Sequence, residues 1–140
     1  SSMITYNIKQ SVAHIGKHKG EKIYYAAPAP QDKISTKQVE DYITSMTSLS
    51  RSDVRSCITA LAEVLRNEMF AGHMVDFADL GSFKLVSTGK HMLKKEEVNA
   101  STLKAPRIQF FPRKELREKA AQVQRVVYDP EAMKKAKKKD

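Results

Sequence analysis

The residues whose chemistry stands out are lysines and arginines in the C-terminal part of the chain. The sequence has 140 residues and a formal net charge of +9. Acidic and basic residues balance over residues 1–83, so the whole excess falls in residues 84–140. An excess of positive charge at one end of the chain favours a polyanionic partner, with nucleic acid first and an anionic membrane surface second. The cations that we expect to contact phosphate groups are Lys84, Lys90, Lys94, Lys95, Lys104, Arg107, Arg113, Lys114 and Arg117.

Two explanations of these cations remain open. The first six flank or line a polar segment, residues 88–106, and each phosphate contact they made would release counterions. The last three fall in the first turns of a predicted helix, where a cation opposes the helix dipole. Phosphate contact therefore explains them better than helix stability does. The alternative for the whole set is an ordinary solvated surface.

Other chemistry-bearing residues give no recognisable site. The single cysteine, Cys57, excludes an internal disulfide framework and a cysteine-rich zinc site. The sequence contains no Ser-His-Asp order, glycine-rich phosphate loop or paired-carboxylate motif. We therefore expect no enzyme activity, no cofactor, no metal and no small-molecule substrate. The histidines are scattered without the spacing of metal ligands, at His14, His18, His73 and His91.

Two amphipathic helices are predicted in the middle of the chain. Ser35 opens an S-x-x-Q capping box, and Ser50 precedes an acidic first turn. We expect helices over residues 35–48 and 50–71, with Gly72 just beyond the second. The apolar stripe of the second helix is wider than one partner face needs. This width favours burial on two sides, within the domain and against another subunit.

The elements that must position the cations follow these helices. Residues 88–106 lack any apolar period and are basic and polar. A helix is predicted to begin at Pro112 and end near Asp129, with Val123 and Val127 on its inner face. Apolar alternation predicts three strands, over residues 74–77, 82–86 and 107–110.

The N-terminal segment, residues 1–30, is predicted to be a β-rich extension. Residues 3–9 and 22–26 alternate or carry β-formers, and a turn-like segment separates them. An isolated hairpin is marginal in water, so this extension must pack on its own domain or on a partner. No secretory signal is visible at the start, and no apolar run is long enough to span a bilayer. We therefore expect a cytoplasmic protein with no membrane partner.

The order of elements resembles the HU / integration host factor family of bacterial histone-like DNA-binding proteins. DLGSF at residues 79–83 looks like the family's Gly-x-Phe turn. FFPRKELR at residues 110–117 looks like its aromatic stretch and short basic helix. The two capped helices look like its dimerisation body. The match covers residues 33–127, and residues 3–30 resemble the extension of a longer histone-like subgroup.

The resemblance implies an α+β fold in an HU-like intertwined homodimer. Its parts would be two N-terminal helices, a three-stranded antiparallel sheet with a β-arm, and a short C-terminal helix. It also implies a nucleoid-associated bacterial protein that binds duplex DNA with little sequence specificity through a basic saddle and β-arms. The corresponding domains are a β extension, an HU-like DNA-binding domain and a basic tail, over residues 1–30, 31–128 and 129–140.

One departure from the family pattern supports a second hypothesis. The family's arm carries an Arg-Asn-Pro tip whose proline wedges between base pairs. No such tripeptide occurs between Phe83 and Phe110, and the tip region holds Glu96 and Glu97 instead. Pro106 lies at the foot of the excursion, where it is poorly placed as a wedge. The alternative function is a dimeric structural or adaptor module that binds protein through the modified arm and the N-terminal hairpin.

Overall fold

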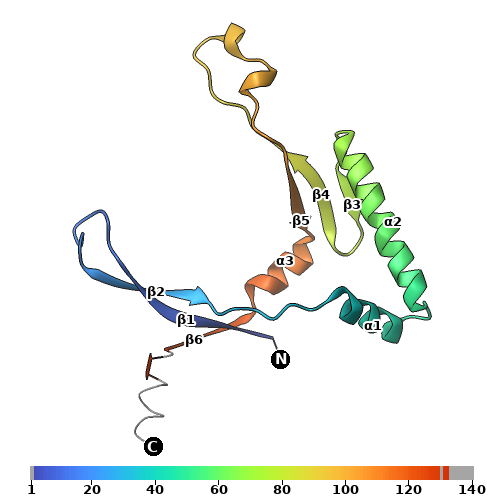
Figure 1. The fold of residues 1–140 in the computed structure, drawn as a ribbon, viewed down its shortest axis with the longest axis horizontal. Helices are drawn as coiled ribbons and strands as arrows, with labels where there is room; N and C mark the ends of the chain where they lie inside the picture. Colours follow the sequence, from blue (N-terminus) through green and yellow to red (C-terminus); the bar gives the residue numbers. More distant parts are fainter. Residues whose placement is uncertain (1, 130, 133–140) are drawn as a thin grey trace, which may run out of the picture. The chain divides into compact units, whose positions relative to one another are not determined.

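The computed structural model describes residues 2–129, 131 and 132. It is a mixed α+β structure with two three-stranded sheets (Figure 1). Contacts within the chain divide it into two units. The first unit, here called the helical unit, is Ile34–Glu118; the second, the terminal unit, joins the residues up to Lys33 with those from Lys119 onward.

The helical unit contains the elements that carry most of the predicted site. Strands β3, β4 and β5 form an antiparallel sheet in that order, which confirms the predicted three-stranded sheet. Helix α3 follows β5 and runs into the terminal unit. The bounds of these elements are α1 Thr36–Met46, α2 Arg51–Phe70, β3 Val75–Phe77, β4 Gly81–Val86, β5 Arg107–Pro112 and α3 Lys114–Ala121.

The ends of α1 and α2 follow from local side-chain and backbone chemistry. Ser35 and Ser50 are both N-caps with complete capping boxes, which confirms the two predicted helix starts. At the other end of α2, Gly72 has φ +88°, and its N–H donates to the Met69 carbonyl at 3.0 Å. The N–H of His73 reaches back to the Glu68 carbonyl, also at 3.0 Å. This pair of bonds is a Schellman motif, with glycine at the left-handed position as predicted.

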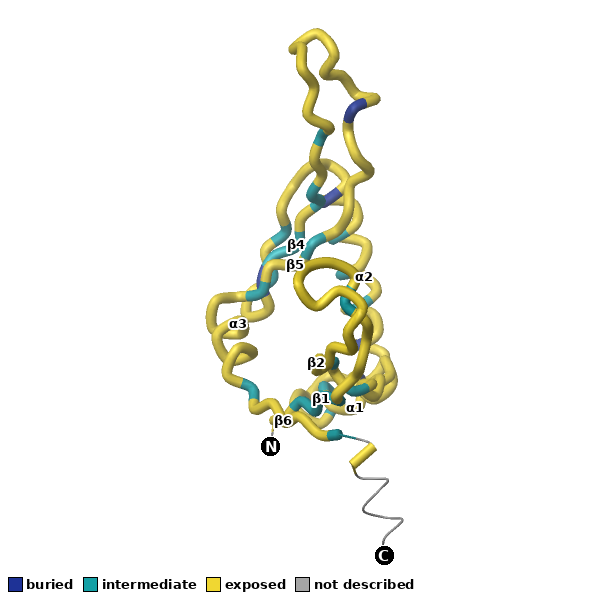
Figure 2. The backbone as a smooth tube through the Cα atoms, turned by 90° about the vertical axis from the view of Figure 1, so that its left-hand side faces the viewer, coloured by how far each residue is buried: buried dark blue, intermediate teal, exposed yellow. Residues whose placement is uncertain are grey.

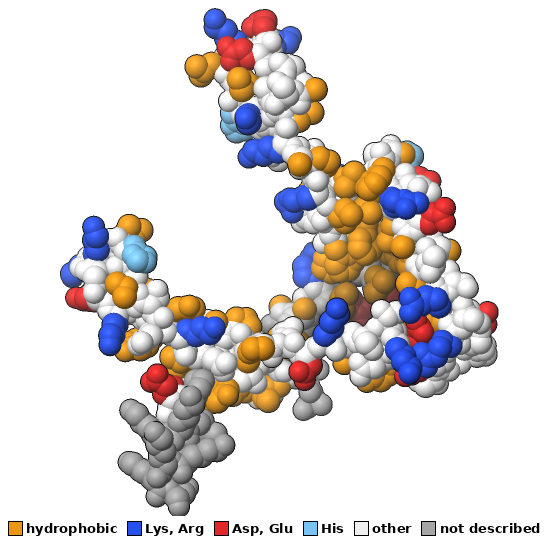
Figure 3. Space-filling view, viewed as in Figure 1, with side chains coloured by type: hydrophobic (Ala, Val, Ile, Leu, Met, Phe, Trp, Pro, Cys, Tyr) orange, Lys and Arg blue, Asp and Glu red, His pale blue; other side chains and the backbone are white. Residues whose placement is uncertain are grey.

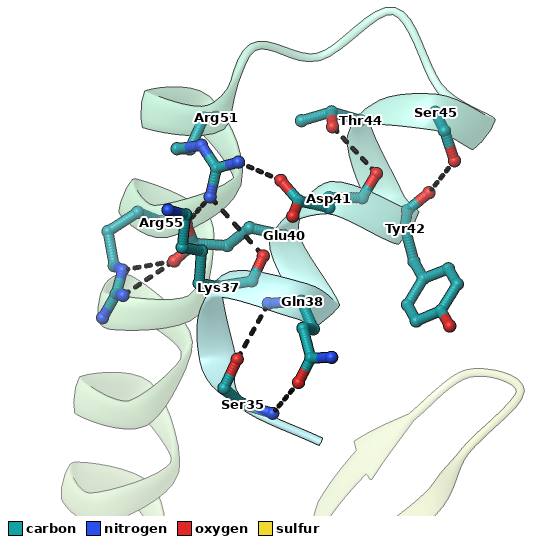
Figure 4. A network of polar contacts seen from close by, with 10 residues as sticks. All are labelled: Ser35, Lys37, Gln38, Glu40, Asp41, Tyr42, Thr44, Ser45, Arg51 and Arg55. Atoms are coloured by element: carbon teal, nitrogen blue, oxygen red, sulfur yellow. Dashed lines mark hydrogen bonds and ion pairs between the residues drawn. The ribbon is translucent and has the colours of Figure 1, made fainter.

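A buried carboxylate joins α1 to α2 (Figure 4). Glu40 is only 3 % exposed. Its Oε1 accepts from Arg55 Nε at 2.8 Å, and its Oε2 accepts from Arg51 Nη1 at 3.2 Å. Arg51 also pairs with Asp41. Both arginines lie on α2 and remain about half exposed. The network therefore links the two helices through one buried residue of α1, Glu40.

The helical unit has almost no interior of its own. Among the described residues, the only buried hydrophobic side chains are Val54 and Met69, at 2 % and 4 % exposure. In Figure 2, accordingly, most of the described residues are coloured as exposed. Phe83 packs against Phe77 and Phe110, with ring centroids 5.9 and 4.9 Å apart. The register puts these rings on the sheet face whose Leu85 and Ile108 line a recess together with Phe70 of α2. Hydrophobic side chains gather over the sheet beside α2 (Figure 3).

The terminal unit is built around the predicted N-terminal hairpin. Strands β1 (Met3–Val12) and β2 (Lys22–Pro28) pair antiparallel, which confirms both predicted strands and extends each. A third strand, β6 (Gln124–Tyr128), pairs with β1 in parallel. The sheet order is β2-β1-β6, so β1 is the central strand. The extension therefore packs on the C-terminal part of its own chain.

Strand β6 corrects the predicted C-terminal helix. That helix was expected from Pro112 to about Asp129, but Pro112 belongs to β5 and α3 ends at Ala121. Val123 lies outside any helix or strand, and Val127 lies in β6 opposite Tyr6. The i, i+4 spacing of these valines suits a helix, but β-branched and aromatic residues also suit a strand. The hydrogen-bonding partner, β1, decides between the two.

The predicted arm is also different in form. The segment between β4 and β5, residues 87–106, is here called the excursion. One isolated bridge joins Gly89 to Leu103 at its foot, and beyond it the chain forms two short 3₁₀ turns instead of a β-ribbon. A polar cap supports the second of these turns, in which the Asn99 side chain accepts from the backbone N–H of Ser101 at 2.8 Å. The predicted basic tail, residues 129–140, lies largely outside the described residues.

Replacement of Glu40 tests the importance of the charged contact between α1 and α2. Glu40→Gln keeps the shape but removes the charge that both arginines contact, so the free energy of unfolding should fall by about 2–3 kcal/mol. Urea unfolding at one fixed protein concentration measures this. The matched control is Glu63→Gln, an exposed position on α2 without an ion pair in the described part of the chain. Equal unfolding midpoints for the two variants would contradict the assigned role.

Candidate nucleic-acid interface

The sheet of the helical unit separates charge from apolar surface by strand alternation. Lys84 lies opposite Gln109, and Arg107 lies opposite Val86, so both cations project from one face of β4 and β5. Phe83 projects from the other face, toward α2. A one-residue slip in register would exchange the two sets. The packing of the phenylalanine rings therefore fixes the direction of the two cations.

Two further cations lie at the foot of the excursion. The N–H of Lys90 donates to the Thr102 carbonyl, and the N–H of Lys104 donates to the Thr88 carbonyl, each at 2.8 Å. These bonds flank the Gly89–Leu103 bridge and hold Lys90 beside Thr102 and Lys104 beside Thr88. Within the described residues, no ion pair or side-chain hydrogen bond engages the cations of this basic strip, which consists of Lys84, Arg107, Lys90 and Lys104.

The remaining excursion lysines share the outer end with acids. Lys94 precedes the first 3₁₀ turn, and that turn consists of Lys95, Glu96 and Glu97. All four side chains are exposed. Two positive charges are therefore followed directly by two negative charges. We expect this part of the excursion to attract phosphate less than the basic strip does.

Arg113 has an intramolecular role that sequence reasoning missed. Its Nε donates to the Ala78 carbonyl at 2.6 Å, and its Nη2 pairs with Asp76. Asp76 also accepts from the Ser82 hydroxyl at 3.1 Å. Arg113 thus closes the β3–β4 turn, in which Ala78 adopts φ +43°. The hydrogen bond from Arg113, and then that from Ser82, hold the pKa of Asp76 below its ordinary value of 3.8.

Gly81 in the same turn explains part of the DLGSF motif. Its φ of +143° is unfavourable for residues with a side chain, and a Cβ there would overlap the Phe111 carbonyl oxygen. Close approach of β5 to β4 therefore requires glycine. The motif is structural, because it brings the two strands together at the end where Arg113 closes the turn.

The last two predicted contacts lie on α3. Lys114 Nζ is 3.9 Å from Glu118 Oε1, a weak and exposed pair. Arg117 is exposed and has no ion pair in the described part of the chain. Both remain available for an external anion.

Other kinds of site are not evident in the described residues. Three or more potential metal-binding side chains do not come together anywhere in residues 2–129, 131 and 132. Over the same residues, none of the helices has the length and apolar character needed to cross a membrane.

Comparison with known proteins identifies the family. A family model described as "HU domain fused to wHTH, Ig, or Glycine-rich motif" matches residues 3–126. The chain belongs to this HU-HIG family. The matched residues include β1 and β2 as well as the helical unit. This confirms the predicted relationship to HU proteins.

Solved structures with a similar fold include the crystal structure of a bacterial protein from Bacteroides vulgatus ATCC 8482 that has been proposed to bind DNA. The TM-score is 0.59 at 15% sequence identity, and the alignment covers 92% of the HU-HIG chain. The HU-HIG chain spans 50% of that protein's length. No curated protein sequence matches the chain.

Titration of Asp76 tests the closure of the β3–β4 turn. A lowered pKa in the folded state stabilises the fold above the ordinary value of 3.8, and this contribution is lost as pH falls through the folded value. In Arg113→Gln, the Asp76 pKa measured by carboxyl NMR should rise toward 3.8. Asp79→Asn, which neutralises another carboxylate of the turn, should leave it low. An Asp76 pKa unchanged by Arg113→Gln would contradict the assignment.

Proposed function

We propose that this HU-HIG chain binds duplex DNA through the phosphate backbone, with little sequence specificity. The observation that carries the proposal is the basic strip, whose cations have no acidic partner among the described residues and leave the sheet on the face away from α2 or at the excursion foot. Cations of this kind gain more from a polyanion than from the fold. The HU relationship and the DNA-binding proposal for the Bacteroides protein support the same function.

The binding form in this proposal is a homodimer. An open apolar recess of about 360 Å³ in the helical unit is lined by Phe70, Leu85, Pro106 and Ile108. Phe70 and Ile108 are more than half exposed, and only Val54 and Met69 are buried apolar residues in the described chain. A second copy would cover these side chains, and each Å² of apolar surface removed from water contributes roughly 25 cal/mol. The intertwined arrangement of HU proteins provides this cover.

The proposed contacts divide into a main and an auxiliary set. The main set is the basic strip, and the auxiliary set is Lys94 and Lys95 on the excursion with Lys114 and Arg117 on α3. Arg113 supports the site by closing the β3–β4 turn. Phosphate contacts carry no base information, so sequence preference would come only from DNA shape. Such a protein would be nucleoid-associated in the bacterial cytoplasm.

A specific observation favours the second function, protein binding through the excursion. Leu93 is fully exposed, and Val98 and Leu103 are each more than half exposed. Exposed apolar residues beside Glu96 and Glu97 suit a protein partner better than a phosphate backbone. The two functions differ in their response to salt, because counterion release governs only the first.

Duplex binding by the whole chain tests the proposed function. Fluorescence anisotropy with generic duplexes of unrelated sequence, between about 50 and 200 mM salt, should show steep weakening and indifference to sequence. Lys94→Glu with Lys95→Glu should reduce affinity, and should lower the salt slope by about 1.8 per chain because each lost phosphate contact removes about 0.9. The dimer should remain intact.

The matched control reverses two neighbouring acids. Glu96→Lys with Glu97→Lys lies in the same 3₁₀ turn and should raise duplex affinity by the same electrostatic reasoning. No binding of the unaltered chain at low salt would contradict duplex binding and leave protein binding as the better function. Unchanged affinity of the Lys94 and Lys95 variant would restrict the contact surface to the other proposed residues.

A further inference from the structure

The β1–β2 hairpin forms a two-stranded ribbon that extends past its own sheet. Strand β6 pairs with β1 only from Met3 to Asn7, whereas β1 and β2 stay paired as far as Val12 and Lys22 (Figure 1). The end is closed by backbone bonds, from the Ala13 N–H to the Glu21 carbonyl at 3.0 Å and from the Gly20 N–H to the Ala13 carbonyl at 2.8 Å. The projecting hairpin is therefore paired as far as Ala13 and Glu21, and residues 14–20 form the loop at its tip.

The charge of this ribbon is more uniformly positive than that of the excursion. Lys17, Lys19 and Lys22 lie at the tip, and their side chains are exposed without an ion pair in the described residues. The only acid at the tip is Glu21, and its Oε2 lies 2.7 Å from His18 Nδ1. In the outer part of the excursion, in contrast, Lys94 and Lys95 stand directly before two glutamates.

We propose that the tip of the β1–β2 hairpin is a second DNA-contacting element, which binds the phosphates of a duplex through Lys17, Lys19 and Lys22. This inference rests on the proposed function and names a surface outside the basic strip. Two-stranded ribbons have dimensions that DNA grooves admit, and lysines at a ribbon end then meet phosphates on the groove walls. The hairpin has the regular ribbon form that the excursion lacks.

A structural explanation of the same lysines competes with this proposal. Edge strands commonly carry lysine to prevent edge-to-edge pairing, and Lys22 begins β2, which is an edge strand of its sheet. Lysines that only guard the edge would affect self-association and leave duplex binding unchanged. Lysines that contact phosphates would change the dependence of duplex affinity on salt.

The test compares two triple variants of the full chain that lose the same charge. The hairpin variant is Lys17→Gln, Lys19→Gln and Lys22→Gln, and the control is Lys33→Gln, Lys37→Gln and Arg66→Gln. The control side chains are exposed and lie away from the hairpin tip in sequence. Duplex affinity is measured by anisotropy over the salt range given above. The hairpin variant should lower the salt slope by about 2.7 per bound chain, and the control should lower it much less.

Further outcomes separate the possible failures. Lys17→Arg, Lys19→Arg and Lys22→Arg retain the charge and should retain the slope of the unaltered chain, and circular dichroism of each variant verifies its fold. Equal slopes for the hairpin and control variants, while the unaltered chain binds duplex, would overturn the hairpin contact and leave the proposed function standing. No duplex binding by the unaltered chain would overturn both. Aggregation of the glutamine variant with an unchanged slope would assign the lysines to edge protection.

Discussion

The chain leaves most of its apolar side chains uncovered, and the rest of the structure depends on this constraint. Helices α1 and α2 and the β3–β4–β5 sheet present a continuous set of hydrophobic side chains, yet only Val54 and Met69 are buried within the described chain. A chain of this length can ordinarily bury about two thirds of its surface. The open recess lined by Phe70 and Ile108 is one place where apolar side chains stay uncovered. A second copy covers them in the proposed dimer.

The same apolar surface orients the charge. Because side chains alternate along β4 and β5, packing Phe83 against Phe110 directs Lys84 and Arg107 to the opposite face. Arg113 then closes the turn that sets this register. Stability and function are thus coupled through the sheet: the residues that fold the helical unit also decide which cations are available to a polyanion.

Sequence patterns predicted the features that depend on near neighbours, and the family resemblance predicted the three-stranded sheet, but several contacts between distant residues were missed. The caps at Ser35 and Ser50 involve residues within one turn, so their pattern was sufficient. Strand β6 depends on β1 at the other end of the chain, and its valines fit a helix equally well when viewed alone. The links from Arg113 to Asp76 and from Glu40 to Arg55 likewise join separate elements. For the candidate site, charge placement predicted a set of cations, which stays a prediction, and the intramolecular partners of Arg113 required the fold.

In the proposed assembly, two copies complete one core and hold one duplex. Sedimentation equilibrium of the chain alone and with a short generic duplex tests this most directly, because mass reports both events. We predict a free species of twice the 15.8 kDa chain mass, and a complex containing two chains on one duplex. A folded single chain at concentrations where duplex is bound, or one chain per duplex, would contradict the account.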